Sequence, residues 1–502
     1  MKLTQLLQAI ENECEVSRVP GLDLAGLEIE DLSYHSGRVG PGDLFLCIPG
    51  EVTDGHLHAQ EAVSAGARAL LVERVVNVEP PVPQMVVSDA RRTAADLADR
   101  FFDHPTGRMV LVGVTGTSGK TTTAHLIRHL LEADGGSVGL VGTVGNIAGG
   151  NWMETTLTTP EATDLQRLFR QMLISGDRAA VMEVSSHSLM LHRVHRCAFN
   201  VGVFTNIAPE HLDFHGDMDS YLAAKARLFT MLTDEGLDRG GPRAVINADD
   251  ARSAEIESRS VAEVLTYGLR GGEVTARDVQ MTQEETTFLL EMPAGRRRVR
   301  LRLPGRFNVY NALAAAAAAH SLDVATGVIA DALSGATPVP GRYEVVSGPG
   351  DDITVIVDFA HTPDELSNLL EAVTSVSAGR VITVFGAGGD RDRTKRPVMG
   401  SVVEDLADYM IVTSDNPRSE DPRAITCDIL RGIEDNASCE VIVDRREAVL
   451  RAVEMAGPAD TVVVAGKGHE TMQILADCAV HFDDRLEARK ALRLRRQRRE
   501  GG

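Results

Sequence analysis

A glycine-rich turn that ends in a lysine is the clearest chemical signal in this chain. An apolar run, residues 111–114, leads into Thr115-Gly-Thr-Ser-Gly-Lys-Thr-Thr122. Glycines let successive backbone N–H groups face an anion, the lysine adds a positive charge, and a threonine hydroxyl can bind Mg²⁺. Val114 stands where the common GxxxxGK pattern has its first glycine. We predict a nucleotide-phosphate site formed by Gly113, Thr115, Gly116, Thr117, Ser118, Gly119, Lys120, Thr121 and Thr122.

Polar residues also follow three other apolar segments, at 138–144, 179–184 and 201–205. The carboxyl ends of parallel strands share one edge of a sheet, so the loops after these strands should converge on the phosphate loop. Their sequences include Thr158-Thr159-Pro160, Glu183-Val-Ser-Ser-His187 and Thr205-Asn-Ile-Ala-Pro-Glu-His-Leu-Asp213. Glu183 and His211 are candidate Mg²⁺ ligands, because this ion prefers oxygen and tolerates nitrogen.

A zinc cluster is an alternative reading of His187, His192, His195 and Cys197. The stretch has no paired CxxC or HxxxH element, and arginines share it, which disfavours zinc.

One lysine lies close to these loops on a predicted helix. Leu222, Ala226 and Phe229 face inward, with a cap at Asp219 or Ser220, and Lys225 lies beside the inward face. From spacing alone, such a lysine is expected at the surface with its ammonium in water.

The last third of the chain repeats one arrangement, in which a strand of β-branched residues ends in a polar loop. The loops bring Asp358, Arg391, Arg418 and Glu470 to one sheet edge. Arginines there suit a carboxylate or a phosphate, and a glutamate suits an amine.

The elements that must position these residues indicate an α/β protein of three domains. We expect a small N-terminal α/β domain (1–108), a central P-loop-type domain with a mostly parallel sheet (109–341) and a C-terminal Rossmann-like domain (342–502).

Within the central domain, we expect residues 270–300 to form one or two polar β hairpins. Asn308 and Asn311 lie one turn apart on an alanine-rich helix, where they could contact a nucleobase or cap the helix. Ser36, in the turn Tyr34-His-Ser-Gly37, is the best candidate of the first domain, although local backbone capping is the favoured explanation of a lone turn serine.

Composition narrows the class of protein. A net charge of −21 over 502 residues argues against a general nucleic-acid binder. The six cysteines have no framework spacing, Glu11 and Glu13 replace the apolar core of a signal peptide, and the apolar run at 312–319 is too short to cross a bilayer. We expect a cytoplasmic monomer without membrane insertion, and we expect the basic stretch 489–499 to be a solvated helix end.

Taken together, the motifs resemble the Mur ligases. The resemblance rests on the phosphate loop, residues 183–187, 205–213, Gly305-Arg-Phe-Asn-Val-Tyr-Asn311, Asp358-Phe-Ala-His-Thr-Pro363, Ser414-Asp-Asn-Pro-Arg418 and Gly466-Lys-Gly-His-Glu470. It covers essentially the whole chain, with the motifs in the family's order. It implies an N-terminal domain for the UDP end of the substrate, a central ATPase and a C-terminal domain that brings an amino acid.

The resemblance also implies a reaction and roles for single residues. ATP would phosphorylate the D-glutamate carboxylate of UDP-MurNAc-L-Ala-D-Glu, and an amine would attack the acyl phosphate. Catalytic positions would be Lys120, Glu183, His211 and Lys225, of which the last three, with Thr121, would hold Mg²⁺. Lys225 would act as a CO₂-derived carbamate, which supplies oxygen where an ammonium would repel the metal. Further ATP contacts would come from Asn308, Arg342 and Asp358, and contacts to the UDP-muramoyl-dipeptide from Ser36, Thr158, Thr159, Ser185 and Arg193.

The resemblance further implies that the loop Asp415-Asn-Pro-Arg418 selects diaminopimelate as the amino acid, whose second carboxylate would pair with the arginine. The resemblance adds Arg391, Gly466 and Glu470 to that pocket, beside Asp415, Asn416, Pro417 and Arg418. The chain departs from the family pattern at Ser118, Leu191, Phe359 and the turn His35-Ser-Gly37. A lysine-adding Mur ligase, a ligase like folylpolyglutamate synthase and a non-catalytic nucleotide-binding scaffold remain as alternatives.

Overall fold

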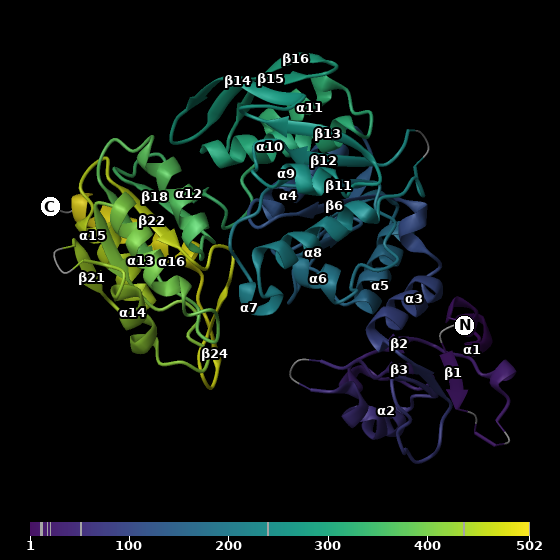
Figure 1. Ribbon diagram of the computed structural model, residues 1–502. Helices are drawn as coiled ribbons and strands as arrows, with labels where there is room; N and C mark the ends of the chain where they lie inside the picture. Colours follow the sequence, from purple (N-terminus) through teal and green to yellow (C-terminus); the bar gives the residue numbers. More distant parts are fainter. Residues whose placement is uncertain are drawn as a thin grey trace.

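The computed structural model describes residues 1–10, 14–17, 19–20, 22–50, 53–237, 240–434 and 437–500. Glu11 and Glu13 lie outside the described residues. Within them, the strands form sheets of five, eleven and six strands and one two-stranded hairpin. The chain passes through the three large sheets in order, so that the central sheet lies between the other two (Figure 1). The predicted α/β class is confirmed.

The N-terminal sheet has the order β1-β5-β4-β3-β2. Its strands are parallel except for β1, which runs antiparallel to β5. The strands are β1 (Cys14–Ser17), β2 (Leu32–Ser33), β3 (Leu44–Leu46), β4 (Ala69–Val72) and β5 (Gln84–Val87). The helices are α1 (Leu3–Leu7), α2 (Ala59–Ala65) and α3 (Ala90–Phe101).

The central sheet has a parallel middle and antiparallel ends, in the order β16-β15-β14-β13-β12-β11-β6-β10-β7-β8-β9. The parallel strands are β6 (Val110–Thr115), β7 (Ser137–Val141), β10 (Asp177–Glu183), β11 (Val201–Phe204), β12 (Arg243–Asn247) and β13 (Glu263–Gly268). One end continues into β14 (Val274–Met281), which lies parallel to β13 and begins the predicted hairpins with β15 (Thr286–Met292) and β16 (Gly295–Leu301). The other end is a hairpin of β8 (Asn146–Ala148) and β9 (Asn151–Met153).

Helices cover both faces of the central sheet, as its buried parallel strands require. One face packs against α4 (Lys120–Ala133), α10 (Arg306–His320) and α11 (Thr326–Gly335). The alanines at 312–319 are fully buried, and their small side chains let α10 pack closely against its neighbours. The other face packs against α5 (Ala162–Ile174), α6 (Ser186–Met190), α8 (Met218–Thr230) and α9 (Ser253–Glu257), and the short α7 (Leu212–His215) precedes α8.

The C-terminal sheet confirms the four predicted strand-and-loop units. Its order is β17-β18-β22-β19-β20-β21, parallel except for β17. The strands are β17 (Glu344–Val345), β18 (Thr354–Asp358), β19 (Val381–Phe385), β20 (Tyr409–Val412), β21 (Cys439–Val441) and β22 (Thr461–Ala465). Helices α12 (Pro363–Thr374), α13 (Lys395–Leu406) and α14 (Pro422–Leu430) cover one face, and α15 (Arg445–Met455) and α16 (Asp484–Glu500) cover the other. A separate hairpin joins β23 (Met472–Ile474) to β24 (Ala479–His481).

Two local expectations are wrong. Helix α8 begins at Met218, and its cap is Asp217, whose carboxylate accepts the N–H of Ser220 at 2.7 Å. Lys225 is buried rather than at the surface, with 1% of its area exposed. Most basic residues of helix α16 are exposed, as expected, and Arg495 and Arg496 also pair with Asp352 and Asp351.

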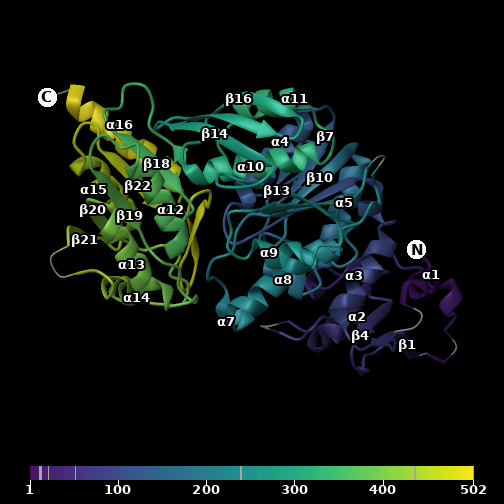
Figure 2. The same cartoon turned by 45° about the horizontal axis from the view of Figure 1, so that its top comes forward.

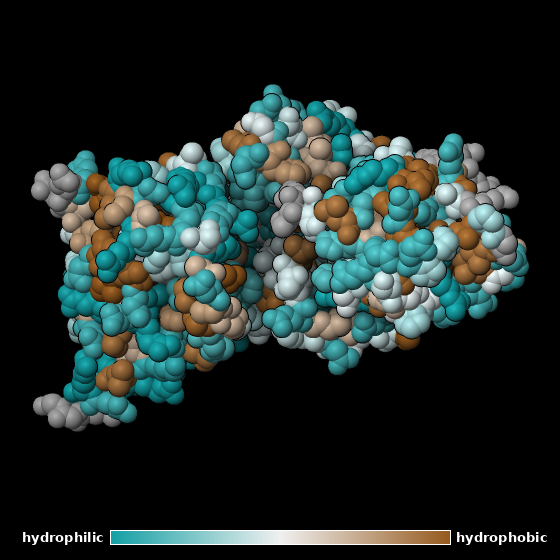
Figure 3. All heavy atoms as spheres, turned by 90° about the horizontal axis from the view of Figure 1, so that it is seen from below, coloured by the Kyte–Doolittle hydropathy of each residue, from teal (hydrophilic) through white to brown (hydrophobic). Residues whose placement is uncertain are grey.

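The central and C-terminal parts of the molecule face each other across a recess. Figure 2 shows the two sheets with their helices as separate bodies, and Figure 3 shows a hollow between them at the surface. No helix among the residues described is long and apolar enough to cross a membrane.

Candidate active site

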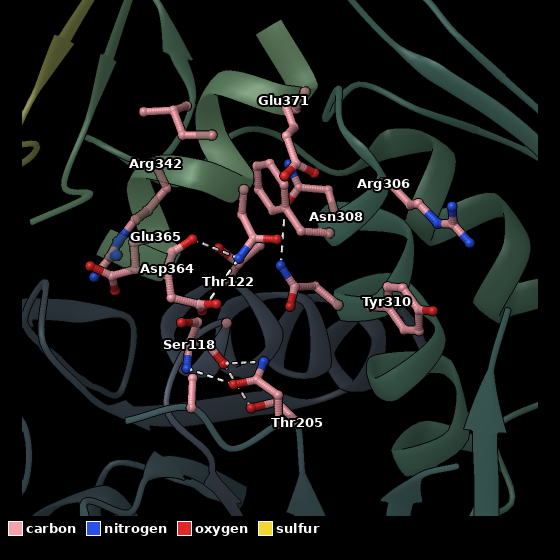
Figure 4. A pocket seen from close by; sticks show the side chains of 18 of the residues that line it. Ser118, Thr122, Thr205, Arg306, Asn308, Tyr310, Arg342, Asp364, Glu365 and Glu371 are labelled. Carbon is pink, nitrogen blue, oxygen red and sulfur yellow. Dashed lines mark hydrogen bonds between the residues drawn. The ribbon is translucent and has the colours of Figure 1, made fainter. Parts of the chain in front are cut away.

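A cavity of about 500 Å³ lies over the phosphate loop. Its floor includes Ser118 and Thr122 from the central domain, and one wall comes from α12 of the C-terminal domain. In Figure 4, Ser118 and Thr205 lie at the base, with Arg342, Asp364 and Glu365 along one side. The cavity is therefore formed by residues of the central and C-terminal domains together.

The phosphate loop is held in shape by the loop that follows β11. The backbone N–H of Ser118 donates to Asn206 Oδ1 at 2.9 Å, and Asn206 Nδ2 donates back to the Ser118 carbonyl at 3.2 Å. The Thr205 hydroxyl donates to the same carbonyl at 2.7 Å. Gly116 and Gly119 have φ angles of +154° and +82°, which explains two of the glycines. The predicted approach of this loop to the phosphate loop is thus confirmed.

Two lysines donate to one carbonyl of this loop. Lys120 Nζ lies 3.0 Å from the Gly116 oxygen, and Lys225 Nζ lies 2.7 Å from the same atom. The ring of Tyr221 lies 4.3 Å from Lys225 Nζ. Burial, together with the nearby Lys120 ammonium, lowers the pKa of Lys225 well below its ordinary value. Lys225 is therefore a buried amine that loses its proton more readily than a surface lysine.

Glu183 joins the phosphate loop to the neighbouring strand ends. Its Oε2 accepts from the hydroxyls of Thr121 at 2.9 Å and Thr143 at 3.1 Å, and its Oε1 accepts from the Thr143 N–H at 2.7 Å. A threonine hydroxyl and a carboxylate are the hard oxygen ligands that Mg²⁺ prefers, so the donors present fit this ion. Among the residues described, no three His, Cys, Asp or Glu side chains gather closely enough to hold a metal.

His211, at the start of α7, belongs to a group of aromatic rings in mostly edge-to-face contact. Its ring centroid lies 4.7 Å from that of His187, which in turn lies 4.3 Å from Phe214. Partial burial is the main reason that the pKa of His211 falls to about 4, so the imidazole is neutral at pH 7. A neutral imidazole can bind a metal through nitrogen.

Residues of the C-terminal domain reach the phosphate loop through the linker between the sheets. Arg342 Nη2 lies 3.3 Å from the Thr121 hydroxyl, and its guanidinium lies 4.6 Å from the centre of the Phe359 ring. Asp358 accepts the N–H groups of Tyr343 at 2.6 Å and Ala360 at 2.7 Å, and burial raises its pKa. Ser118 Oγ and Arg342 Nε line the cavity as buried atoms without a hydrogen-bond partner in the described structure. Donors of this kind fit an anionic ligand.

The linker residue Gly341 touches the loop that follows β22. Its φ of +67° lies in the left-handed region, and an added Cβ would collide with the backbone of Gly468 and His469. Glycine is therefore required at this position.

Asn308 and Asn311 both point toward the phosphate loop from α10. Asn311 Nδ2 donates to Asn308 Oδ1 at 3.1 Å, and the Thr123 hydroxyl donates to Asn311 Oδ1 at 3.2 Å. Asn308 Nδ2 also donates to the Pro304 carbonyl at 2.7 Å, as a capping residue would. Asn308 nevertheless lines the cavity, so its capping bond and a nucleobase contact are compatible.

A second group of predicted residues lies around the loop after β9. The Thr159 hydroxyl donates to the Glu183 carbonyl at 2.9 Å and accepts the Ser185 N–H at 3.2 Å. Arg193 donates to the Thr159 carbonyl at 3.2 Å and pairs with Glu161 at 2.9 Å. Thr158, whose hydroxyl lies 3.1 Å from that of Thr143, completes the group.

Ser36 is not part of this cluster, but its turn is tied to the central domain. Ser36 lies in the short 3₁₀ turn Ser36–Arg38 of the N-terminal domain. The neighbouring Tyr34 donates its hydroxyl proton to Asp164 of α5 at 2.6 Å. Arg91 of α3 pairs with Glu161 at 3.2 Å and extends this contact.

The loop 415–418 follows β20 and meets the loop after β22. Asn416 Nδ2 donates to Glu470 Oε2 at 2.8 Å, and the fully buried Lys467 donates to Asn416 Oδ1 at 2.9 Å and to Glu470 Oε2 at 2.8 Å. Asp415 Oδ2 is buried without a hydrogen-bond partner in the part of the chain described, and Gly466 lies directly against it. This unpartnered acceptor fits a substrate ammonium group.

Arg418 reaches the loop 386–392, which follows β19. Its Nη1 donates to the Gly389 carbonyl at 2.8 Å. Arg391 is exposed on the same loop. The amino-acid candidates therefore come from three neighbouring strand ends of one sheet.

Sequence reasoning assigned no role to Asn206, Lys467, Arg396 or Glu420. Asn206 could have been found, because it lies in the loop after β11, close to a strand end as Glu183 is. Lys467 carried a weaker signal, its position between two glycines. Arg396 and Glu420 form a buried ion pair between segments that are distant in sequence, and spacing does not reveal such a contact.

Comparison with known protein families gives three matches along the chain. The family model described as "Mur ligase middle domain" matches residues 114–319. "Mur ligase, glutamate ligase domain" matches residues 341–468, and "Mur ligase family, catalytic domain" matches residues 28–101.

Curated relatives match over nearly the full length. The UDP-N-acetylmuramoyl-L-alanyl-D-glutamate–2,6-diaminopimelate ligase of Gloeobacter violaceus is 46% identical over 500 residues, 99% of each chain. The protein of the same name from Geobacillus thermodenitrificans is 44% identical over 491 residues, 96% of this chain and 99% of its own.

Solved structures match as well. A UDP-N-acetylmuramoyl-L-alanyl-D-glutamate–2,6-diaminopimelate ligase structure is 31% identical, with a TM-score of 0.66 over 95% of this chain and 97% of the other. The MurF ligase of Thermotoga maritima, solved in complex with ADP, shares the fold at 21% identity, with a TM-score of 0.66 over 94% of this chain and 99% of its own.

Proposed function

The chain belongs to the Mur ligase family, and we propose on that premise that it adds 2,6-diaminopimelate to UDP-N-acetylmuramoyl-L-alanyl-D-glutamate at the expense of ATP. It is thus an ATP-dependent amide ligase of peptidoglycan precursor synthesis. One observation carries the proposal: the sheet edge that completes the cavity over the phosphate loop also holds the loop 415–418. Nucleotide and amino acid would therefore meet at one edge.

The reaction has two balanced steps. The γ-phosphoryl group of ATP passes to the side-chain carboxylate of D-glutamate, and ADP leaves. The amine of diaminopimelate then attacks the acyl-phosphate carbon, loses a proton and expels inorganic phosphate. Phosphoryl transfer depends on alignment and charge neutralisation, which Lys120 of the phosphate loop and Arg342 beside Thr121 would supply.

The nucleotide contacts follow from the cavity. The phosphate-loop residues 115–122 and Gly113 would hold the phosphates with Arg342, Asn308 would contact the base, and Asp358 would contact the ribose. Ser36, Thr158, Thr159, Ser185 and Arg193 would hold the UDP-muramoyl-dipeptide. The contacts of Arg193 and Thr159 support this, because they join the loop after β9 to Glu183, which lies beside the phosphate loop.

Mg²⁺ would be held by Thr121, Glu183, His211 and Lys225 as a carbamate, and it would neutralise phosphate charge. Carbamylation consumes a neutral amine: R–NH₂ and CO₂ give R–NH–COO⁻ and a proton. The lowered pKa of Lys225 favours the neutral amine. The carbamate would place a negative charge next to the Lys120 ammonium, because both lysines contact the Gly116 carbonyl.

The amino-acid pocket would use Arg391, Asp415, Asn416, Pro417, Arg418, Gly466 and Glu470. The unpartnered Asp415 oxygen supports binding of an ammonium, and the guanidinium of Arg418 supports binding of a second carboxylate. Lysine lacks that carboxylate and would leave the arginine unpaired, which costs on the order of 2–5 kcal/mol.

We propose domain boundaries at 108/109 and 341/342, a cytoplasmic location and a monomer. The strand content of each sheet and the position of Gly341 between the central and C-terminal sheets support the boundaries.

The test is phosphate release by the purified protein. We expect release from ATP when UDP-muramoyl-L-alanyl-D-glutamate and diaminopimelate are both present, and little when either is omitted. Equal turnover with lysine would contradict the proposed amino acid. Turnover with a folate and glutamate would favour the folylpolyglutamate synthase-like alternative, and no turnover with any amino acid would favour a scaffold.

A further inference from the structure

Two loops of the C-terminal sheet are joined through their main chains next to Arg418. The Gly389 N–H donates to the Asn416 carbonyl at 2.9 Å, and the Gly389 carbonyl accepts from Arg418 Nη1 at 2.8 Å. A Cβ on Gly389 would collide with the Pro417 carbonyl, so the approach is as close as the backbone allows. The position of the Arg418 head group therefore depends on where the segment 388–390 lies.

A buried ion pair holds that segment from the protein interior. Arg396 has no exposed surface, and its Nη2 and Nη1 donate to the two oxygens of Glu420 at 2.8 and 3.0 Å. Arg396 Nη2 also lies 3.3 Å from the Gly388 carbonyl, and Glu420 Oε1 accepts the Asp390 N–H at 2.7 Å. The pair thus binds the main chain on both sides of Gly389.

The ion pair also has partners away from the loops. Arg396 Nη1 donates to Asp428 of α14 at 2.9 Å, which links α13 to α14. Arg393, with two-thirds of its side chain exposed, lies 2.8 Å from Glu420. The hydrogen bonds from Arg396 are the main reason that the pKa of Glu420 falls to about 2, so its carboxylate is charged at neutral pH. These two extra contacts do not involve segment 388–390 and offer matched controls.

We propose that Glu420 and Arg396 are positioning residues that set the selectivity of the amino-acid site by fixing Gly389 and, through it, the guanidinium of Arg418. The inference rests on the proposed function, because Arg418 is taken to bind the second carboxylate of diaminopimelate. A planar guanidinium recognises a carboxylate through paired N–H groups only when its orientation is fixed. A shift of Gly389 would misplace those donors.

The test compares Glu420→Gln with two control variants in the phosphate-release assay. Glutamine keeps the shape of Glu420 and removes the charge that holds Arg396. We expect KM for diaminopimelate to rise about tenfold, since small misplacements of a binding group carry losses of this order. KM for ATP should stay unchanged, and the preference for diaminopimelate over lysine in kcat/KM should fall by a similar factor.

The controls separate positioning from packing. Asp428→Asn removes the helix–helix contact of the same arginine, and Arg393→Ala removes the exposed partner of the same glutamate. Both should leave KM for diaminopimelate within about twofold, because neither contact involves segment 388–390. An equal rise in KM in Asp428→Asn and Glu420→Gln would overturn the inference in favour of general packing.

A second variant distinguishes loss of positioning from loss of folding. Arg396→Lys keeps the charge but lacks the forked donors, and it should reproduce the rise in KM at an unchanged melting temperature. An unchanged KM for diaminopimelate in both Glu420→Gln and Arg396→Lys would refute the positioning role while the proposed function stands. Failure of the unmodified protein to use diaminopimelate would instead refute the proposed function.

Discussion

Lys225 is the residue whose burial most constrains the chemistry of the site. It lies against the Gly116 carbonyl that Lys120 also contacts, so two cations would share one oxygen. Desolvation and the second cation both favour the uncharged amine, which is the form that reacts with CO₂. A carbamate at this point would remove the repulsion between the two side chains.

Replacing Lys225 by arginine tests this role. Arginine keeps a positive charge and cannot form the carbamate, so we expect ligase turnover to fall at least about 100-fold, as when one transition-state contact is lost. Carbon-13 NMR in ¹³C-bicarbonate should show a carbamate signal in the unmodified protein and none in Lys225→Arg. The buried Lys467, paired with Glu470, remains in both proteins as an internal control. A signal that persists in the variant would contradict the assignment.

Arg418→Lys tests amino-acid selection at the level of one side chain. Lysine retains the charge but not the fork of donors, so we expect the preference for diaminopimelate over lysine in kcat/KM to fall by about 100-fold. Arg423→Lys, at an exposed position five residues further on, is the control and should change neither constant. An unaltered preference in Arg418→Lys would show that another residue binds the second carboxylate.

At the scale of elements, the parallel strands were the most predictable feature. Strands β10 and β11 lie within two residues of the segments expected at 179–184 and 201–205, because buried parallel strands appear as short apolar runs bounded by polar loops. The hairpin β8–β9 was missed, since its strands have only three residues each. Runs so short carry no period in the sequence.

Site residues were predictable where they lie at the end of a strand. They were less predictable where contacts between segments distant in sequence determine the position of the side chain. Glu183 and Thr121 were found because a parallel sheet brings strand ends together. The burial of Lys225 was not, because it depends on the phosphate loop packing across α8 from more than a hundred residues away. The Arg396–Glu420 pair escaped prediction for the same reason.

Helix α16 gives a prediction about stability and pH. Asp352 accepts two hydrogen bonds from Arg495 at 2.9 Å, and this is the main reason that its pKa falls to about 2 from an ordinary 3.8. A lowered pKa in the folded state stabilises the protein above the unfolded pKa, and the gain is lost as the pH falls from about 4 to 2. We expect Asp352→Asn to lower the free energy of unfolding of the C-terminal domain by about 1–2 kcal/mol at pH 7.

Denaturation of both proteins between pH 7 and pH 2 checks this. The difference in the free energy of unfolding between the two proteins should be constant above pH 5 and should shrink toward zero near pH 2. A difference that grows on acidification would contradict the stabilising role of the Asp352 carboxylate.

At the scale of the whole molecule, the substrate sites follow the order of the chain. The cavity over the phosphate loop is lined by central and C-terminal residues. The N-terminal domain contacts the central one on a different side, through α3 and α5. Changes at that contact should therefore affect one substrate only.

Tyr34→Phe tests this separation. Loss of the hydroxyl removes the bond to Asp164 and loosens the turn that carries Ser36, so we expect KM for the UDP-linked substrate to rise about three- to tenfold, the equivalent of one hydrogen bond. KM for ATP and for diaminopimelate should not change. Tyr409→Phe removes a comparable bond to Glu440 on β21 and should change none of the three. A parallel rise in all three constants would indicate that the domains respond as one body.

The contact between Gly341 and the backbone of Gly468 and His469 has a consequence for the exchange of parts between related ligases. A crossover at the linker would join one parent's Gly341 to the other parent's 466–470 loop. Such a hybrid can keep this close approach only if the first parent has a glycine at 341 and the second has the same loop backbone. Compatibility of grafted C-terminal domains should therefore depend on this main-chain contact, whatever the amino-acid preference of the two parents.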